Sequence, residues 1–353
     1  MSPKISVILP SRNEKDTIGH CIKEIKKVAR EENLSLEIIV SDSSNDGSHE
    51  IAEREGIMVI KHDQEGYGFA IKEGVTHARG EIIIYADADN TYRFADIPKF
   101  LKELENCDIV IGSRLRGIIE KGAMPLPHRF LGTPLFNLLL KMFFGIKISD
   151  SQSGYRAMKR KTFFDLDLKT NGMEFATEMI IKAHRMHFCI NEIPTDYALR
   201  GGISKLRRYR DGFAHLKYIL LQAPLTFFLG GGGILFFLGI LGLLGGNDIH
   251  RFFTLATVKI FFPVLGIQII FFGFFAKTYL MTRFGEKNEF MKNFYSKFKF
   301  SSALMLGLLF ITFAIIIRVA GAGNEYFDII LVSALIGSQI IFNSMVLSTL
   351  SIK

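Results

Sequence analysis

The pattern of hydrophobic positions divides the chain near residue 222. Before that point, apolar runs of four or five residues alternate with stretches whose apolar residues recur at helical spacing. Beyond it, four apolar stretches are long enough to cross a bilayer, at about 223–244, 255–280, 302–321 and 328–350. The pattern therefore predicts a soluble domain over 1–210, an amphipathic linker over 211–222 and an all-α membrane domain over 223–353.

The first part alternates strands with helices. Apolar runs predict strands at 5–9, 36–40, 57–60, 82–85 and 108–112, and helical spacing predicts helices at about 14–30, 49–55, 67–78 and 96–105. We expect Asn13 to cap the first helix and Ser48 the second. This short-range alternation predicts an α/β fold, a doubly wound and mostly parallel sheet with helices on both faces.

Two later segments precede the membrane part. The apolar stretch 130–144 contains Gly132 and Pro134 and is too short to span a bilayer. It suits a helix on the membrane surface or under a cleft, and a core helix fits equally well. Residues 171–187 read as a helix that places Glu174 and Glu178 on one face.

The charge pattern points to phosphate and lipid rather than nucleic acid. The net charge is +8, and a dense basic stretch at 200–210 lies beside the apolar third. Positive charges also gather in the loop between the second and third membrane stretches, whereas the other two loops carry few. The positive-inside rule therefore places the first domain, this loop and both termini in the cytosol, as parts of an integral membrane protein.

Two aspartates follow the strand predicted at 82–85. Side chains alternate along a strand, so Asp87 and Asp89 can point to the same side where it ends. Two adjacent carboxylates are costly without a positive charge between them, and Mg²⁺ or Mn²⁺ prefers such oxygen ligands. The alternative is a solvated loop rich in aspartate.

Polar residues also end the other predicted strands, at Pro10–Glu14 and Asp42. In open parallel sheets, ligands bind beyond the carboxyl ends of the strands, so these clusters should converge on one crevice. A nicotinamide fingerprint is a poor match, because Gly66-Tyr67-Gly68 follows the third strand and Ile71 stands at the third glycine position. The sequence also lacks a phosphate-loop motif.

Taken in order, these motifs resemble the family 2 glycosyltransferases, and within them the polyprenyl-phosphate (dolichyl-phosphate) hexose synthases. The resemblance covers about 1–220, and a four-helix tail occurs in some members of that group. Its motifs are Pro10–Glu14, Asp42 with Asp46-Gly47-Ser48, Gly66–Gly68, Asp87–Asp89, Gly112–Arg114, Ser153-Gly154 and Arg200–Leu206. It implies a glycosyltransferase A-type fold.

The resemblance also implies roles for individual residues. Nucleotide-sugar binding would fall to Pro10, Arg12, Glu14, Asp42, Asp87, Asp89, Arg200, Ser204 and Lys205. Asp87 and Asp89 would form the metal site, and the residues carrying catalysis would be Asp89, Arg114, Arg129 and Lys205. Glu178 is a further candidate for contact with sugar hydroxyls.

One position departs from the family pattern. The mannose synthases of the family usually carry Asp-x-Asp-x-Gln, and this chain has Thr91 at the last position. The third protein ligand of the metal is thus unassigned, and the Asp-Asn-Thr-Tyr run looks more like branches that use UDP-sugars.

The expected reaction is a metal-dependent, inverting transfer of a hexose from UDP-glucose, UDP-N-acetylglucosamine or GDP-mannose to a polyprenyl or dolichyl monophosphate. The acceptor phosphate is already ionised near neutral pH, so no strong general base is needed. Alternatives are extension of a lipid-linked oligosaccharide or polysaccharide, and a non-catalytic membrane scaffold or lipid-flipping protein that binds nucleotide sugar. The processive polysaccharide synthases use a Gln-x-x-Arg-Trp motif, and this sequence has no tryptophan. Homo-oligomerisation is left open.

Overall fold

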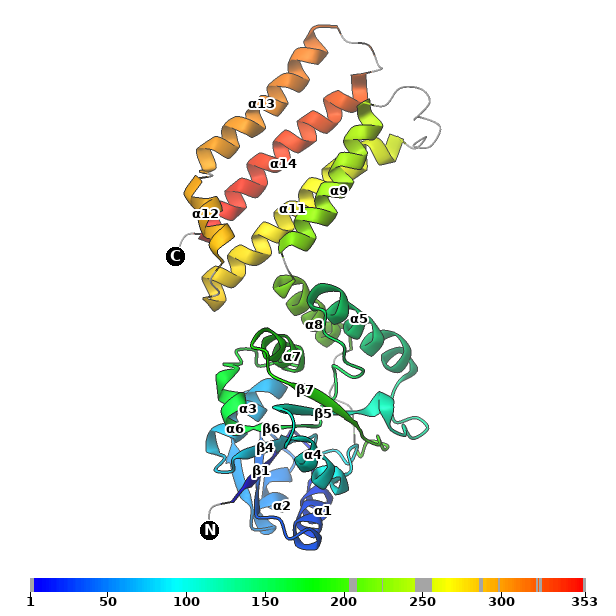
Figure 1. The fold of residues 1–353 in the computed structure, drawn as a ribbon, viewed down its shortest axis with the longest axis vertical. Helices are drawn as coiled ribbons and strands as arrows, with labels where there is room; N and C mark the ends of the chain where they lie inside the picture. Colours follow the sequence, from blue (N-terminus) through cyan, green and yellow to red (C-terminus); the bar gives the residue numbers. More distant parts are fainter. Residues whose placement is uncertain are drawn as a thin grey trace. The chain divides into compact units, whose positions relative to one another are not determined.

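A seven-stranded sheet organises the first of two units, Met1–Ile219; the second is Leu220–Lys353 (Figure 1). The computed structural model describes residues 3–202, 208–223, 225–244, 256–285, 288–297, 299–321, 323 and 326–351. The strands are β1 (Ile5–Ser11), β2 (Leu36–Asp42), β3 (Met58–Lys61), β4 (Ile82–Tyr85), β5 (Ile109–Ser113), β6 (Arg156–Lys159) and β7 (Ile190–Pro194).

The strand order is β3-β2-β1-β4-β6-β5-β7, and all neighbours are parallel except where β6 pairs antiparallel with β4 and β5. This confirms the predicted α/β fold with a mostly parallel sheet. The strands β6 and β7 were not predicted. They are short and carry polar residues, so neither shows the apolar run of β4 or β5.

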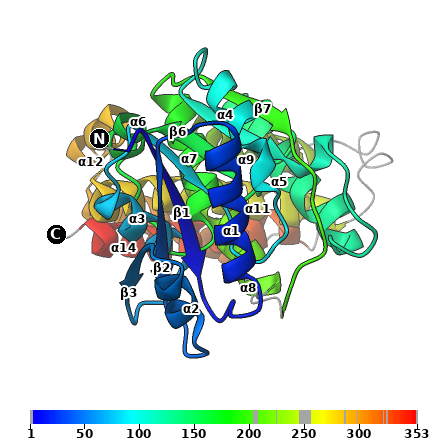
Figure 2. The ribbon, with the colours of Figure 1, turned by 90° about the horizontal axis from the view of Figure 1, so that it is seen from below.

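Alternating side chains of the sheet supply two cores. Val7 and Leu9 face one core, and Ile8 between them faces the other. The first core is covered by α1 (Ile18–Glu31), α2 (Ser48–Arg54) and α4 (Ile97–Glu103). The second is covered by α3 (Tyr67–His77), α5 (Thr133–Phe144), α6 (Arg160–Asp165), α7 (Phe175–Arg185) and the end of α8 (Arg208–Gln222). Figure 2 shows α1 and α3 on opposite sides of β1 and β2.

Both predicted helix caps are wrong. Helix α1 begins at Ile18 rather than near Glu14, and Asn13 adopts a positive φ of 53°. The Asn13 side chain instead accepts a hydrogen bond from the Asn45 backbone (2.9 Å). The Ser48 hydroxyl accepts one from the Glu14 backbone (2.9 Å), and α2 has no side-chain cap. These side chains join the loop after β1 to the loop after β2.

Helix α5 is preceded by a π-helical turn, His128–Gly132. Leu140 is fully buried in the second core, and neighbouring phenylalanines pack there too. On the other side of α5, Leu135, Leu138 and Met142 are exposed. The helix thus packs on the core and also presents an apolar face, so contact of that face with a membrane surface stays a prediction.

The second unit contains α9 (Leu225–Leu244), α11 (Ala256–Phe284), α12 (Glu289–Lys297), α13 (Phe300–Val319) and α14 (Phe327–Ser351). By length and composition, four helices can cross a membrane: Leu225–Leu244, Val258–Arg283, Phe300–Val319 and Phe327–Leu350. The predicted four-helix membrane tail is confirmed, and the chain is an integral membrane protein.

Glycine pairs let these helices approach closely. A Cβ added to Gly266 in α11 would lie 2.5 Å from the Gly232 carbonyl oxygen in α9. Gly307 in α13 and Gly337 in α14 meet in the same way, with the corresponding distances 2.7 and 2.6 Å. In the run 230–233, an added Cβ would meet a neighbour only at Gly232. Small residues at helix crossings are the usual device for packing in lipid.

Candidate active site

The predicted site residues gather at the point where the strand order reverses. From β1, the chain builds β2 and β3 on one side, whereas β4 lies on the other side. Ser11 ends β1 in register with Asp42 at the end of β2, and Asp87 and Asp89 follow β4. A reversal of this kind leaves a crevice beyond the carboxyl ends of the strands.

Thr91 orients the second aspartate. Asp89 is 1% exposed, and its Oδ1 accepts hydrogen bonds from the Thr91 backbone (3.1 Å) and hydroxyl (2.5 Å). Its Oδ2 lies 3.2 Å from Nη1 of Arg200. Thr91, at the position where the family pattern has Gln, therefore fixes the orientation of the Asp89 carboxylate.

Arg200 supplies the positive charge beside the acidic residues. Its Nη2 donates to Oε1 of Glu14 (2.8 Å), and Gly201 donates its backbone N–H to the Asp89 carbonyl (2.9 Å). Glu14 is buried and Arg200 is half-buried, so this ion pair is partly shielded from water. The structure thus brings together three predicted residues, Glu14, Asp89 and Arg200, from distant parts of the chain.

Asp87 lies in an unfavourable environment for a negative charge. Burial, followed by the negative charge of Asp89, raises the pKa of Asp87 to about 7, although Arg200 and Arg114 act in the opposite direction. A Cβ at Gly154 would lie 2.8 Å from the Asp87 carboxylate. Tyr67 donates its hydroxyl to the Gly154 carbonyl (3.2 Å), so the glycine is held against the aspartate.

The donor set fits a hard divalent cation. Asp87 and Asp89 both offer carboxylate oxygens, and burial together with the charge of Asp89 raises the pKa of Asp87, a cost that a bound cation would offset. Among the described residues, no cluster of three or more His, Cys, Asp or Glu side chains could hold a metal. A cation here would need further oxygens from outside the protein, as Mg²⁺ and Mn²⁺ commonly take from phosphate.

The residues predicted to hold the nucleoside lie along β1 and β2. Pro10 pairs with Ser41, and Asp42 is fully buried and accepts two hydrogen bonds from Ser44 (3.1 and 2.5 Å). Arg12 contacts Glu65 at 2.5 Å on the surface. This part of the crevice is therefore a polar edge, and Arg12 lies half-buried beside it.

Two further predicted arginines differ in their surroundings. Arg114 donates Nε and Nη2 to Asp150 (2.7 and 2.8 Å) and lies 5.2 Å from the centre of the Tyr197 ring. Arg129 is exposed in the π-helical turn, 5.4 Å from the Phe130 ring. The predicted residues Ser204 and Lys205 lie outside the described residues.

Arg156 has a structural role at the site, which the sequence did not indicate. It is fully buried on β6 and donates to the carbonyls of Ser151, Ser153 and Ala176 (2.9–3.0 Å). It therefore fixes the loop that carries Gly154. The signal was weak because the sequence does not distinguish a buried arginine from a surface one.

Glu178 does not serve as a sugar contact in this fold. Its carboxylate is fully buried and accepts hydrogen bonds from the Lys169 and Thr170 backbones and the Thr170 hydroxyl. Lys182 adds an ion pair at 2.8 Å. These bonds hold the pKa of Glu178 below its usual range despite its burial.

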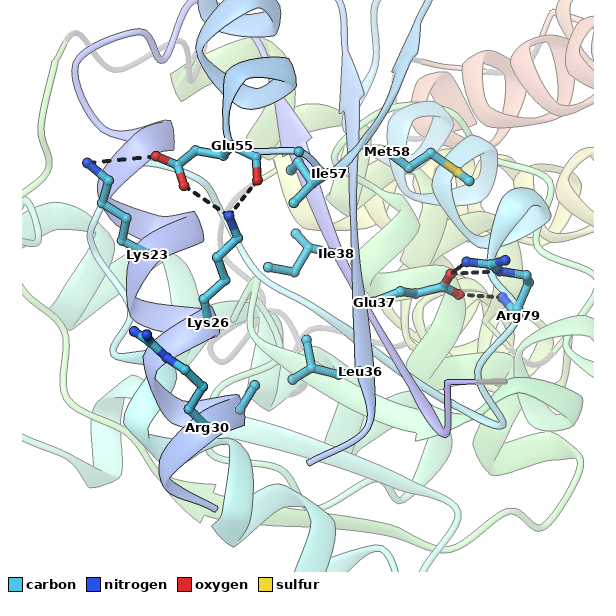
Figure 3. Close-up of a pocket in the computed structure, with 12 residues that line it drawn as sticks. Lys23, Lys26, Arg30, Leu36, Glu37, Ile38, Glu55, Ile57, Met58 and Arg79 are labelled. Carbon is cyan, nitrogen blue, oxygen red and sulfur yellow. Dashed lines mark hydrogen bonds and ion pairs between the residues drawn. The ribbon is translucent and has the colours of Figure 1, made fainter. Parts of the chain in front are cut away.

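A separate groove of about 620 Å³ lies at the amino ends of β2 and β3 (Figure 3). Glu55 binds Lys23 and Lys26 along it, and Glu37 binds Arg79. Its acidic groups are therefore already paired. It lies at the opposite ends of the strands from Asp87 and is not the crevice described above.

The fold is shared with a solved structure. The solved structure of glucosyl-3-phosphoglycerate synthase from Mycobacterium tuberculosis, in complex with Mn²⁺, UDP and phosphoglyceric acid, superposes with a TM-score of 0.50. The two are 20% identical, and the match covers 63% of this chain and 80% of that one. The fold is therefore of the glycosyltransferase A type.

Sequence comparison then gives the family. Residues 6–166 match the model of glycosyl transferase family 2. Glycosyltransferase AglJ of Haloferax volcanii is 31% identical over 212 residues, which cover 59% of this chain and 68% of that protein. The chain belongs to glycosyl transferase family 2 and is a glycosyltransferase. The non-catalytic scaffold is therefore not retained.

Two other relatives come from the same organism. Low-salt glycan biosynthesis hexosyltransferase Agl6 is 37% identical over 245 residues, which cover 69% of this chain. The chain spans 59% of the length of that relative. Dolichyl-phosphate hexose transferase is 29% identical over 218 residues, which cover 61% of this chain and 92% of that protein.

Proposed function

We propose that this glycosyltransferase moves a hexose from a nucleotide diphosphate sugar to a polyprenyl or dolichyl monophosphate. The observation that carries the proposal is the cluster of Asp87, Asp89 and Arg200 at the sheet crevice of an integral membrane protein. The acidic pair suits a metal-bound diphosphate, and the membrane helices suit a lipid acceptor. The name of the dolichyl-phosphate hexose transferase agrees with this acceptor.

The donor would lie across the polar edge of the sheet. Pro10, Arg12, Glu14 and Asp42 would hold the nucleoside, with Asp87 beside them. The pairing of β1 with β2 supports this role for Pro10 and Asp42, because it sets these two residues at a fixed spacing. Tight binding of one donor would follow from that pre-organisation rather than from flexible loops.

Asp87 and Asp89 would hold Mg²⁺ or Mn²⁺ on the donor diphosphate, where the cation would neutralise charge on the leaving group. The fit rests on the two carboxylates themselves and on the raised pKa of Asp87. Thr91 holds Asp89 in one orientation, so that its Oδ2 remains directed toward the crevice side occupied by Arg200.

The basic residues would act on phosphate oxygens. An oxygen of the acceptor phosphate attacks the anomeric carbon, that carbon's bond to the donor phosphate breaks, and the nucleoside diphosphate leaves, so the configuration inverts. Arg200, Arg129, Ser204 and Lys205 would stabilise these negative charges. Within the described part of the chain, Asp150 holds Nε and Nη2 of Arg114, which leaves Nη1 for such a contact.

The reaction would take place at the cytosolic face of the membrane. Support comes from the charge distribution, since Arg283, Lys292, Lys297 and Lys299 all lie near the loop between the second and third spans. The same rule would place both termini in the cytosol.

A donor screen with the purified full chain tests the proposal. The protein is incubated with a polyprenyl phosphate, Mn²⁺ or Mg²⁺, and one donor at a time: UDP-glucose, UDP-N-acetylglucosamine or GDP-mannose. The masses of the products are measured by mass spectrometry. A single added hexose is the expected result. Products that appear only with a lipid-linked oligosaccharide acceptor, lengthened by sugar units, would reject the monophosphate acceptor.

Asp89→Asn tests the site. We expect a loss of about 100-fold or more in kcat/KM at saturating metal, because charge stabilisation of the leaving diphosphate is removed. The matched control is Asp165→Asn, an exposed carboxylate on α6. Near-full turnover of the Asp89 variant would refute metal-assisted departure of the nucleotide.

A further inference from the structure

A cavity of about 260 Å³ lies within the second unit, between α12, the start of α13 and the end of α14. Figure 1 shows these three segments at one end of the helical unit. At about 30 Å³ per water it has room for roughly eight waters, enough for a phosphate group and a short piece of hydrocarbon. Its apolar lining includes Phe294, Phe300 and Leu347, and its polar lining includes Lys299, Ser344 and Ser348.

Ser344 has an unsatisfied hydroxyl at this cavity. Its side chain is 5% exposed, and its Oγ has no hydrogen-bond partner in the described part of the chain. By contrast, Ser338 of the same helix donates to the Ala334 carbonyl (2.9 Å), and Thr349 donates to Met345 (3.0 Å). An unpaired buried hydroxyl is unfavourable, so a polar ligand group at this position would relieve the cost.

The cavity also has a positive side. Lys299 is exposed and immediately precedes α13, a helix of 20 residues. The first N–H groups of a helix lack acceptors within it and attract anions. An ammonium group, a helix start and a hydroxyl at one cavity together favour a phosphate over a neutral headgroup.

The depth of the cavity suits a lipid. Lys299 stands just outside the span Phe300–Val319, and Ser344 lies seven residues before the end of α14 at Ser351. At 1.5 Å per residue, Ser344 is about 10 Å from that end. Headgroups meet hydrocarbon chains at this level of a bilayer.

We propose that this cavity binds the phosphate group of a membrane lipid. Lys299 and the Ser344 hydroxyl contact the phosphate, and Phe294, Phe300 and Leu347 line the start of the hydrocarbon. The cavity is lined by residues of the second unit alone, and the proposal does not depend on which sugar is transferred. Lipids that share this chemistry are anionic phospholipids and polyprenyl phosphates.

Native mass spectrometry of the full chain in detergent tests the proposal. The protein is titrated with phosphatidylglycerol, polyprenyl phosphate, uncharged polyprenol, phosphatidylcholine or inorganic phosphate. We expect one equivalent of a lipid with an anionic phosphate to be retained. Comparison of phosphatidylglycerol with polyprenyl phosphate identifies which of the two lipids the cavity prefers. Lys299→Gln should weaken that binding about tenfold, since one charge-assisted hydrogen bond is lost. Ser344→Leu should block it by filling the cavity.

The matched controls are Lys297→Gln, a nearby exposed lysine, and Ser338→Ala, whose hydroxyl is already bonded to its own helix. Both should bind lipid as the unaltered protein does. Equal retention of polyprenol and polyprenyl phosphate would overturn the phosphate assignment. Equal binding of inorganic phosphate alone would overturn the lipid assignment, and unchanged binding in both cavity variants would overturn the location. None of these readouts involves sugar transfer.

Discussion

Replacing Asp87 by asparagine should stabilise the first unit at pH 8 when no divalent metal is present. Burial and the charge of Asp89 raise the pKa of the Asp87 carboxyl from 3.8 to about 7. The folded protein therefore binds this proton more tightly than the unfolded chain does. The stability contributed by the carboxyl is fully present below about pH 4 and is lost as the pH rises to about 7.

The size of the effect follows from the pKa. A difference of about 3 units at about 1.4 kcal/mol per unit gives a ceiling of about 4 kcal/mol at pH 8. That pKa already includes the attraction of the carboxylate to Arg200. Because the asparagine amide is also costly to bury there, we expect about 2 kcal/mol, or roughly 4–8 °C in Tm for a domain of this size. At pH 5.5, midway through the titration window, the advantage should fall to about half.

The cysteines provide the assay. All three cysteines lie in the first unit; Cys21 and Cys107 are buried, and Cys189 is exposed. In a Cys189→Ser background, a thiol-reactive fluorescent dye therefore reports the unfolding of this unit and not of the membrane helices. Unfolding is followed by heating the full chain in detergent with a metal chelator.

Asp46→Asn is the matched control, because its shift has the opposite sign. Hydrogen bonds from Ser48 and the Lys15 backbone outweigh its desolvation and lower the pKa of Asp46. That stability is present above pH 4 and lost as the pH falls, so Asp46→Asn should destabilise the unit at pH 8. An Asp87→Asn protein no more stable than its parent at pH 8, or equally favoured at pH 5.5, would refute the reasoning. Added Mn²⁺ should stabilise the parent and leave the Asp87 variant unchanged.

Three further substitutions address other parts of the molecule. Arg200→Gln should lower kcat/KM about 100-fold, because Asp89 loses its cation and phosphate loses a donor; activity within threefold of the parent contradicts that. Gly154→Ala should reduce kcat/KM tenfold or more with the fold retained, since its Cβ would lie 2.8 Å from the Asp87 carboxylate; an unchanged KM for metal and an unchanged rate contradict it. Gly266→Ala should lower the Tm followed by circular dichroism in detergent, because α9 must move away from α11 by several tenths of an ångström; an equal Tm means that the helices separate without cost. The matched control for Arg200→Gln is Arg30→Gln, because Arg30 lies at the other end of the sheet. The controls for Gly154→Ala and Gly266→Ala are Gly212→Ala and Gly231→Ala, since an added Cβ meets no neighbour at either glycine.

Local sequence patterns were sufficient to predict most of the strands and helices of the first unit. The run Ile82–Tyr85 is a buried strand in both the prediction and the structure, because four apolar residues before a polar loop have few other solutions. Strand β6 was missed because its place between β4 and β5 is set by long-range pairing rather than by its own residues, Arg156–Lys159. The helix-cap predictions were wrong for a related reason. Asn13 and Ser48 each accept a hydrogen bond from the backbone of the other's loop, at Asn45 and Glu14, instead of from a helix start.

For the candidate site, sequence reasoning predicted residue types better than their partners. Spacing and resemblance predicted the Asp87–Asp89 pair and the basic stretch at 200–210. That Arg200 lies between Glu14 and Asp89 could not be predicted, since it depends on where the chain returns after β7. Nor could the sequence show that Asp150 engages Arg114, because any of several nearby carboxylates was an equal candidate.

The paired glycines make the membrane unit a set of two modules. Gly232 packs against Gly266 between α9 and α11, and Gly307 packs against Gly337 between α13 and α14. Each helical hairpin therefore has a close backbone contact of its own. Each hairpin crosses the bilayer twice and returns the chain to the side from which it entered. Gain or loss of a whole hairpin therefore preserves the sidedness of every other segment, whereas loss of one helix reverses the sidedness of all later segments. Membrane tails of this architecture can change length in steps of two helices without relocating the catalytic domain.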